Sequence, residues 1–264
     1  MTKIICGFLL LAVCCGNTWG QASKYSFAAT SGNATVLGCS TPIMDPIARC
    51  PDQSWVYADN QGVIFYDGSF GMQAQDAYGL LQASGEAVVN CHFTCAAGSA
   101  SSGAGGQAVF NDEFTFVGLP GDGPYFLVVN LAVVGATSGG WRRGISSVIV
   151  NASADLTVAG APLQQCIPAI VNDSANQGVY RRTCISRIQF SPTDTVKLAA
   201  IFSLGLSAVT PESTTNGVIQ TVQSDFLSSK GYGARYTVHI EDAKGRKVNK
   251  GQIITASGVT YPTH

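Results

Sequence analysis

The stretch GYGARYTVHIEDAKGRKV (231–248) carries the clearest structural pattern in the chain. Across residues 235–241 apolar and polar side chains alternate, so one face of a strand is apolar and the other is polar. Asp-Ala-Lys-Gly at 242–245 has turn chemistry, because Asp caps a turn through its side chain and Gly accepts a left-handed backbone. Within 216–257 the sequence therefore predicts a strand, a loop, a β-hairpin and a final strand.

The preceding chain repeats this strand pattern. Residues 147–158 and 196–208 alternate cleanly, and two apolar runs within 54–67 flank a turn signal. No window shows a helical period. We expect an all-β fold, an antiparallel β-sandwich of jelly-roll-like type with about 12 to 14 strands and disulfide-stapled loops. Without an internal linker, residues 21–264 are predicted to form a single domain.

Small residues mark the segments that we expect to be irregular. Residues 23–34 are predicted to be a loosely held start, and 35–52 a disulfide-closed loop. The Gly-, Ser- and Ala-rich run 96–106 is predicted to be a flexible loop, as is the segment 135–144. No Lys-Ser/Thr pair follows the first of these, which argues against a phosphate-binding loop.

Composition limits the possible partners. Charged residues make up 12% of the 264-residue chain and its net charge is −1. This balance gives no electrostatic basis for binding nucleic acid or an anionic membrane.

The first 20 residues are predicted to be a cleaved signal peptide. Lys3 precedes the apolar run 4–13, which is too short to span a bilayer, and cleavage is expected before Gln21. Lipidation at Cys14 is an alternative, although Val13 is larger than the small residue that such a signal prefers. Once the signal is removed, no transmembrane segment is expected, and the protein is predicted to be secreted, extracellular or on the cell surface.

Cysteine usage agrees with export. An even number of cysteines remains after the signal peptide, which in an exported chain indicates disulfides. Their spacing suggests three local bridges, although six cysteines allow fifteen pairings. The suggested pairs are Cys39–Cys50, Cys91–Cys95 and Cys166–Cys184. A metal site around Cys91 and Cys95 is the weaker reading, because a second ligand cluster is missing.

Three segments resemble the β-sandwich ectodomains of bacterial exosortase substrates of the PEP-CTERM type. They are MQAQDAYGLLQA (72–83), DEFTF (112–116) with the turn GLP after it, and the D-x-x-G-x-x-V run at 242–248 followed by ASG. The resemblance implies a secreted sandwich with a surface or matrix role and carries no catalytic residue. The sorting tail of that family does not follow, so release outside the cytoplasm is expected instead of covalent sorting.

Catalytic and metal-binding patterns are sparse. No H-E-x-x-H or G-x-S-x-G motif occurs, and His239 is expected to be a solvated strand residue near Arg235 and Glu241. Paired carboxylates of a glycoside hydrolase are the remaining enzymatic option. The candidates are Asp112, Glu113, Asp155, Asp225, Glu241 and Asp242. No cofactor is predicted, although a structural calcium ion near Asn111 to Glu113 or at Asp122 is possible.

Exposed aromatic side chains are candidates for sugar binding. Trp141 lies in a glycine-flanked loop beside Arg142 and Arg143, which makes these three the predicted ligand-binding residues. Glycosylation sequons begin at Asn33, Asn151 and Asn172.

The sequence thus favours a secreted, non-enzymatic structural or interaction protein of the cell surface or extracellular matrix. Its expected partners are copies of itself, joined through edge strands, or other matrix components. A carbohydrate-binding module that uses loop aromatics is the first alternative, and a carboxylate-dependent glycoside hydrolase is the second.

Overall fold

The computed structural model describes most of the chain between residues 22 and 262. The described residues are 22–31, 37–40, 47–58, 61, 64–94, 96–139, 147–168, 171–172, 178–210, 218–229 and 231–262. The predicted signal peptide lies outside these residues.

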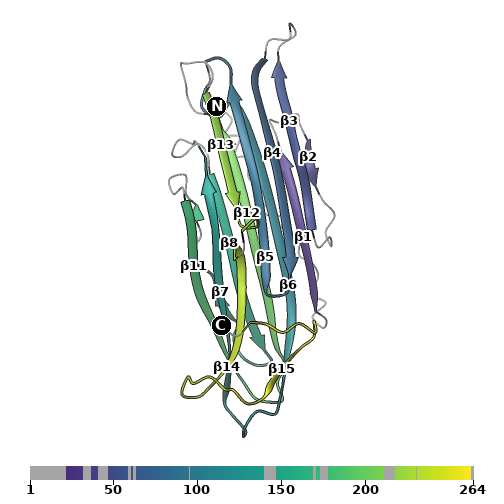
Figure 1. Cartoon of the computed structure of the whole chain (residues 1–264), viewed down its shortest axis with the longest axis vertical. Coiled ribbons are helices and arrows are strands. Elements are labelled where there is room, and N and C mark those ends of the chain that lie inside the picture. Colours follow the sequence, from purple (N-terminus) through teal and green to yellow (C-terminus); the bar gives the residue numbers. More distant parts are fainter. Residues whose placement is uncertain are drawn as a thin grey trace.

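Two antiparallel sheets pack face to face, with their strands running along the longest axis of the molecule (Figure 1). Sheet A contains β1 (Ser23–Ser31), β2 (Leu37–Ser40), β6 (Ser101–Val117), β8 (Ser147–Val158), β9 (Gln164–Cys166), β10 (Val171–Asn172), β12 (Val196–Val209) and β15 (Gln252–Thr255). Sheet B contains β3 (Ile47–Ala58), β4 (Ile64–Ala77), β5 (Leu80–Cys91), β7 (Tyr125–Ser138), β11 (Gly178–Phe190), β13 (Val218–Asp225) and β14 (Gly233–Asp242). The predicted all-β antiparallel sandwich is confirmed.

The core follows directly from the period-2 pattern. In β12 every second residue, from Val196 to Ala208, is buried between the sheets, and β8 alternates in the same way. Tyr236 of β14 is fully buried, and its hydroxyl oxygen lies 3.0 Å from the carbonyl oxygen of Ser153 and 3.1 Å from that of Ile201. The face predicted to be apolar in β14 is therefore the core face, and its tyrosine links sheet B to sheet A.

In each sheet, two strands lie one after the other at the same position in the strand order. We call such a position a shared lane. β15 pairs with β6 at residues 114–117, and β1 continues the same edge of β6 at residues 103–111. In sheet B, β13 and β14 run in the same direction between β5 and β7. The chain leaves this second lane at 226–232 and then returns to it.

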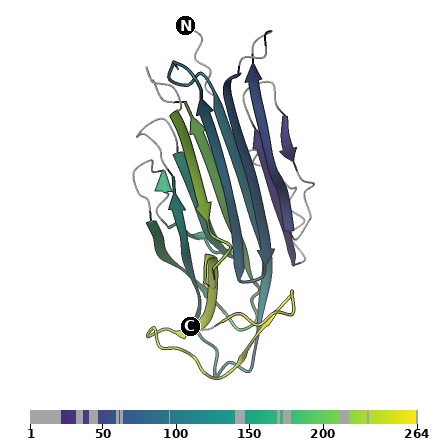
Figure 2. The same cartoon turned by 45° about the horizontal axis from the view of Figure 1, so that its top comes forward.

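The predicted hairpin at 231–248 is present, but its return arm is short. Beyond the turn at 242–245, the return segment makes one bridge, between Glu241 and Lys247, and the Val248 N–H donates to the carbonyl of Ile240. The chain then crosses to sheet A as β15, and Figure 2 shows this C-terminal segment looping beneath the ends of the long strands. The turn chemistry was read correctly, but the partner of the final strand is β6.

The glycine-rich run is also strand rather than loop from Ser101 onward. Gly106 lies where a Cβ would stand 2.9 Å from Sδ of Met72 in the opposite sheet. Small residues here allow the two sheets to approach, and the regular pairing of β6 with β1 and β12 satisfies the backbone. The predicted loose start at 23–34 is likewise strand over residues 23–31, because β1 pairs along its whole length with β6.

β7 continues through Gly135, inside the segment predicted to be a loop. A Cβ on Gly135 would lie 2.2 Å from Cδ1 of Phe226, whose ring is fully buried. Phe226 is the first residue after β13, and its N–H donates to the carbonyl of Ala83. The missing side chain at 135 therefore makes room for the ring at the point where the chain leaves the lane.

Candidate functional site

The loop predicted to bind a ligand lies outside the described residues. This applies to Trp141, Arg142 and Arg143, and among the sequons to Asn33 and the side chain of Asn172. Asn151 is half-buried on the outer side of β8, where it is paired with Ser203 of β12.

The predicted bridge between Cys166 and Cys184 is confirmed, and it joins β9 of sheet A to β11 of sheet B. It therefore closes one side of the sandwich across its two layers. Cys50 and Cys91 are also disulfide-bonded. Cys95 and the side chain of Cys39, their predicted partners, lie outside the described part of the chain.

Asp112 is a buried structural carboxylate. Its Oδ1 accepts the N–H of Glu113 at 2.9 Å and the N–H of Ser257 at 3.0 Å. Its Oδ2 accepts the hydroxyls of Ser257 at 2.5 Å and Tyr261 at 2.8 Å. Burial, and then the charge of Asp112, raise the pKa of Tyr261 well above its usual value. Asp112 thus fastens the C-terminal segment to the interior.

Other acidic candidates are engaged separately. Glu113, on the opposite face of β6 from Asp112, forms an ion pair with Lys197 at 3.2 Å. Burial raises the pKa of Asp155, and a hydrogen bond donated by Gln165 opposes that effect. Asp225 accepts hydrogen bonds from the backbone N–H groups of Leu227 and Ser228, just after β13 ends. These carboxylates therefore belong to different local structures.

The suggested calcium positions show similar local uses. The Asn111 side-chain amide donates to the Ser23 hydroxyl at 3.2 Å, while both oxygens of Asp112 accept protein hydrogen bonds. Asp122 is exposed in the turn before β7. Among the described residues, no group of three or more His, Cys, Asp or Glu side chains could hold a metal ion.

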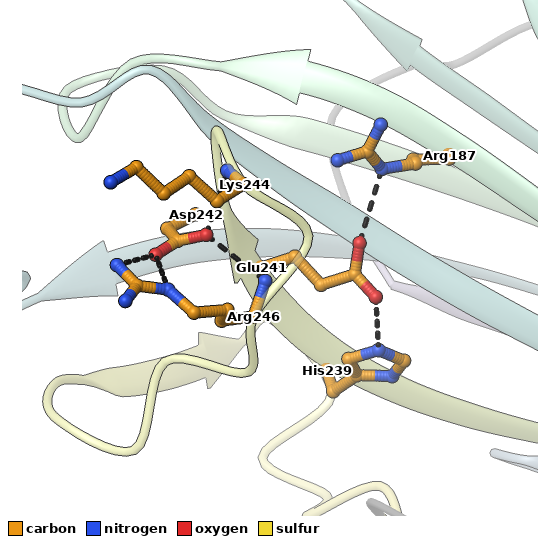
Figure 3. A network of polar contacts seen from close by, with 6 residues as sticks. All are labelled: Arg187, His239, Glu241, Asp242, Lys244 and Arg246. Atoms are coloured by element: carbon orange, nitrogen blue, oxygen red, sulfur yellow. Dashed lines mark hydrogen bonds and ion pairs between the residues drawn. The ribbon is translucent and has the colours of Figure 1, made fainter.

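A polar network lies on the outer face of sheet B, where β11 and β14 flank β7 (Figure 3). One oxygen of Glu241 forms an ion pair with Nε of Arg187 at 3.2 Å, and its other oxygen lies 3.1 Å from Nε2 of His239. The Arg187 guanidinium also lies over the Phe126 ring, 3.6 Å from its centroid. The pairing of His239 with Glu241 fits the prediction, but the His239 side chain is only 13% exposed and is not a solvated residue.

The adjacent turn is held by Asp242. Its carboxylate accepts the backbone N–H groups of Lys244 at 2.8 Å and Arg246 at 3.0 Å, and the Nε of Arg246 at 2.8 Å. The backbone and side-chain hydrogen bonds of Arg246 lower the pKa of Asp242 to about 2. The turn therefore presents Lys244 in a fixed backbone conformation.

Two hollows lie on either side of His239, near the turn after β14. One, of about 570 Å³, lies on the sheet between β11 and the turn after β14; we call it the β11–β14 groove. The other, of about 640 Å³, lies between β14 and the C-terminal segment, and His239 lines both. The groove residues used below are Val128, Asn130, Ile185, Arg187, Glu241 and Lys244.

Sequence reasoning missed Arg187 as a partner of Glu241. Alternation alone places each side chain on a polar face, but 54 positions separate them along the chain. They meet because Glu241 pairs with Phe126 of β7, and β7 pairs Val128 with Arg187 on its other side. The basic run at 244–250 was the available signal, since it holds four of the 15 Lys and Arg residues.

Comparison with models of known protein families gives no match, and comparison with curated proteins gives none either. In the part of the chain that the structure describes, no helix is long and apolar enough to cross a bilayer.

Proposed function

We propose that the protein is a secreted, non-enzymatic structural or interaction protein of the cell surface or extracellular matrix that associates with its own copies through edge strands. The predicted signal peptide, the low charge and the disulfides support export. The observation that carries the proposal is the outer edge of β11, along which no other described strand is paired.

β11 is 13 residues long and, among the described strands, pairs only with β7. Val179 is 72% exposed and Ile185 is 64% exposed on this strand. Long edge strands with apolar side chains are templates for strand addition. β3, the edge strand on the opposite side of sheet B, is interrupted by irregular pairing around Pro51 and is a poorer template.

The charge of β11 determines the kind of assembly that is favoured. The strand carries Arg181, Arg182 and Arg187 and has no carboxylate, so two β11 strands repel one another. Contact between β11 and a different edge of the next copy avoids this repulsion. Such head-to-tail contacts do not close on themselves unless a rotation completes a ring, so they produce filaments.

Light scattering after size exclusion, with negative-stain electron microscopy, tests this on oxidised protein lacking residues 1–20. We expect concentration-dependent polymers that the double variant Val179→Lys, Thr183→Lys abolishes, because it extends the like-charged row on β11. Ile219→Lys is the matched control, since Ile219 is 56% exposed on the same sheet but lies in the inner strand β13. A monomer at every concentration, or polymers unaffected by the double variant, would contradict the proposal.

A further inference from the structure

Arg187 is held in place with its terminal nitrogens free. Its Nε forms an ion pair with Glu241, and its guanidinium lies over the Phe126 ring. Neither terminal nitrogen has a partner among the described residues, and in Figure 3 the ion pair with Glu241 reaches only Nε. A guanidinium fixed in this way loses little conformational freedom when it binds an anion, and its planar fork suits a carboxylate.

A second cation, Lys244, also lines the groove. Its side chain projects from the Asp242 turn on the side away from Arg187 (Figure 3), and its ammonium group has no partner in the described part of the chain. Arg187 and the segment 241–250 together carry more positive than negative groups, whereas the whole chain has a net charge of −1. The cations are Arg187, Lys244, Arg246, Lys247 and Lys250, and the carboxylates are Glu241 and Asp242. This local excess favours an anionic ligand.

The groove also provides the other contacts that a sugar ring needs. The amide of Asn130 and the carboxylate of Glu241 line it and can bond to hydroxyl groups. Ile185 exposes 64% of its surface at the rim and offers an apolar contact for the C–H face of a ring. A volume of about 570 Å³ is in the range of small-ligand sites.

We propose that the β11–β14 groove binds an acidic sugar unit of an extracellular polysaccharide. The sugar carboxylate binds the terminal nitrogens of Arg187, Lys244 adds a second positive charge at the groove, and the sugar hydroxyls bond to Asn130 and Glu241. An acidic peptide would use the two cations but would leave the hydroxyl-binding groups unmatched. The inference rests on the extracellular location in the proposed function and is independent of self-assembly.

Binding is measured by isothermal titration with polygalacturonate oligosaccharides, their methyl esters and poly-L-glutamate. The Val179→Lys, Thr183→Lys background is used alongside the unaltered chain, so that failure to assemble does not prevent the measurement. We expect binding of the free acid that weakens with salt, and at least about tenfold weaker binding of the ester, which lacks the charge. Equal binding of poly-L-glutamate would identify an acidic-peptide site and overturn the proposal, as would no binding of the free acid.

Two variants locate the site. Lys244→Gln and Arg187→Lys are each expected to weaken binding by roughly tenfold, the second because it keeps the charge but loses the planar fork. Lys250→Gln is the matched control, because it removes the same charge from the same basic run, 244–250, without lining the groove. Equal losses for Lys244→Gln and Lys250→Gln would show unspecific charge attraction and overturn the site.

A spectroscopic measurement separates binding from folding. The Nε–H signal of Arg187 in the folded protein is expected to shift when the polygalacturonate oligosaccharide is added, while the ring signals of His92 stay unchanged. An unshifted Arg187 signal at a saturating concentration would place the sugar elsewhere.

Discussion

Replacing Gly135 with Ala adds a single methyl group, but we expect it to destabilise the protein strongly. The added Cβ would lie 2.2 Å from Cδ1 and 2.4 Å from Cε1 of Phe226. Carbon atoms in contact normally stand about 3.5–4.0 Å apart, so the overlap is more than about 1 Å. Phe226 cannot move easily, because its fully buried ring packs on Phe202 with centroids 5.4 Å apart.

Overpacking of a filled core costs about 1–3 kcal/mol, and the size of this overlap places Gly135→Ala near about 3 kcal/mol. Urea unfolding with the disulfides intact measures the loss. In a Phe226→Ala background the clash disappears, so the second substitution is expected to cost close to nothing. The two changes should therefore show a coupling energy of about 2–3 kcal/mol in a double-mutant cycle.

Gly205→Ala is the matched control. Gly205 also lies inside a long strand, but its Cβ would stand 3.8 Å from the nearest atom, the Cβ of Ile149. We expect a change within about 1 kcal/mol of zero. If Gly135→Ala and Gly205→Ala cost the same, or if Phe226→Ala gives no rescue, the proposed close contact is refuted.

Three further predictions concern the polar and covalent ties. Asp112→Asn is expected to cost about 2–3 kcal/mol in urea unfolding, because an amide group cannot accept all four hydrogen bonds that reach the carboxylate. Asp242 should titrate by NMR at a pKa of about 2, and Arg246→Ala should raise that pKa while the backbone bonds remain. Because the folded pKa is depressed, this stabilisation is present above the unfolded pKa of 3.8 and is lost as pH falls through about 2. Replacing Cys166 and Cys184 by Ser, 18 positions apart, should cost about 3 kcal/mol in thermal or urea unfolding.

Each of these has a clear opposing result. Asp122→Asn, in an exposed turn, is the control for Asp112→Asn, and equal effects would exclude the buried role. A pKa for Asp242 near 4, or one that does not respond to Arg246→Ala, would contradict the turn geometry. An unchanged unfolding midpoint in the double Ser variant would mean that the bridge adds nothing to the packing of the two sheets.

Period-2 alternation was sufficient to predict the core faces. In β8, β12 and β14 the pattern is local, and any sheet that buries one face must bury the same set of side chains. The sequence therefore predicted the fold class and the inward position of Tyr236. The partner of each strand was harder to predict, because the turn at 242–245 does not show how far the return arm stays paired before the chain crosses to the other sheet.

The glycine-rich segments were misread for a physical reason. Gly106 and Gly135 lie in segments whose composition is typical of loops, but each lies where a side chain from the other sheet or from the neighbouring strand position needs space. Met72 and Phe226 supply those side chains from positions distant in the sequence. Only the assembled sandwich shows that small size, and not backbone freedom, is what these positions require.

The candidate site depends on register in the same way. Polar faces could be predicted for β11 and β14, but the contact between Arg187 and Glu241 requires both strands to pair with β7 in one particular alignment. Asp112 shows the same limit, since its hydrogen-bond donor Ser257 is 145 residues further along the chain.

The shared lane of β15 and β1 has a mechanical consequence. Ser23 pairs with Asn111, and Thr255 pairs with Phe114. The start of β1 and the end of β15 therefore lie about 10 Å apart along β6. A pulling force applied between these two strands would act across that short gap and not along the length of the sandwich. Load would therefore fall first on the four-residue pairing of β15 and on the hydrogen bonds to Asp112. The long ladders of β12 and β7 would stay unloaded until that segment had detached.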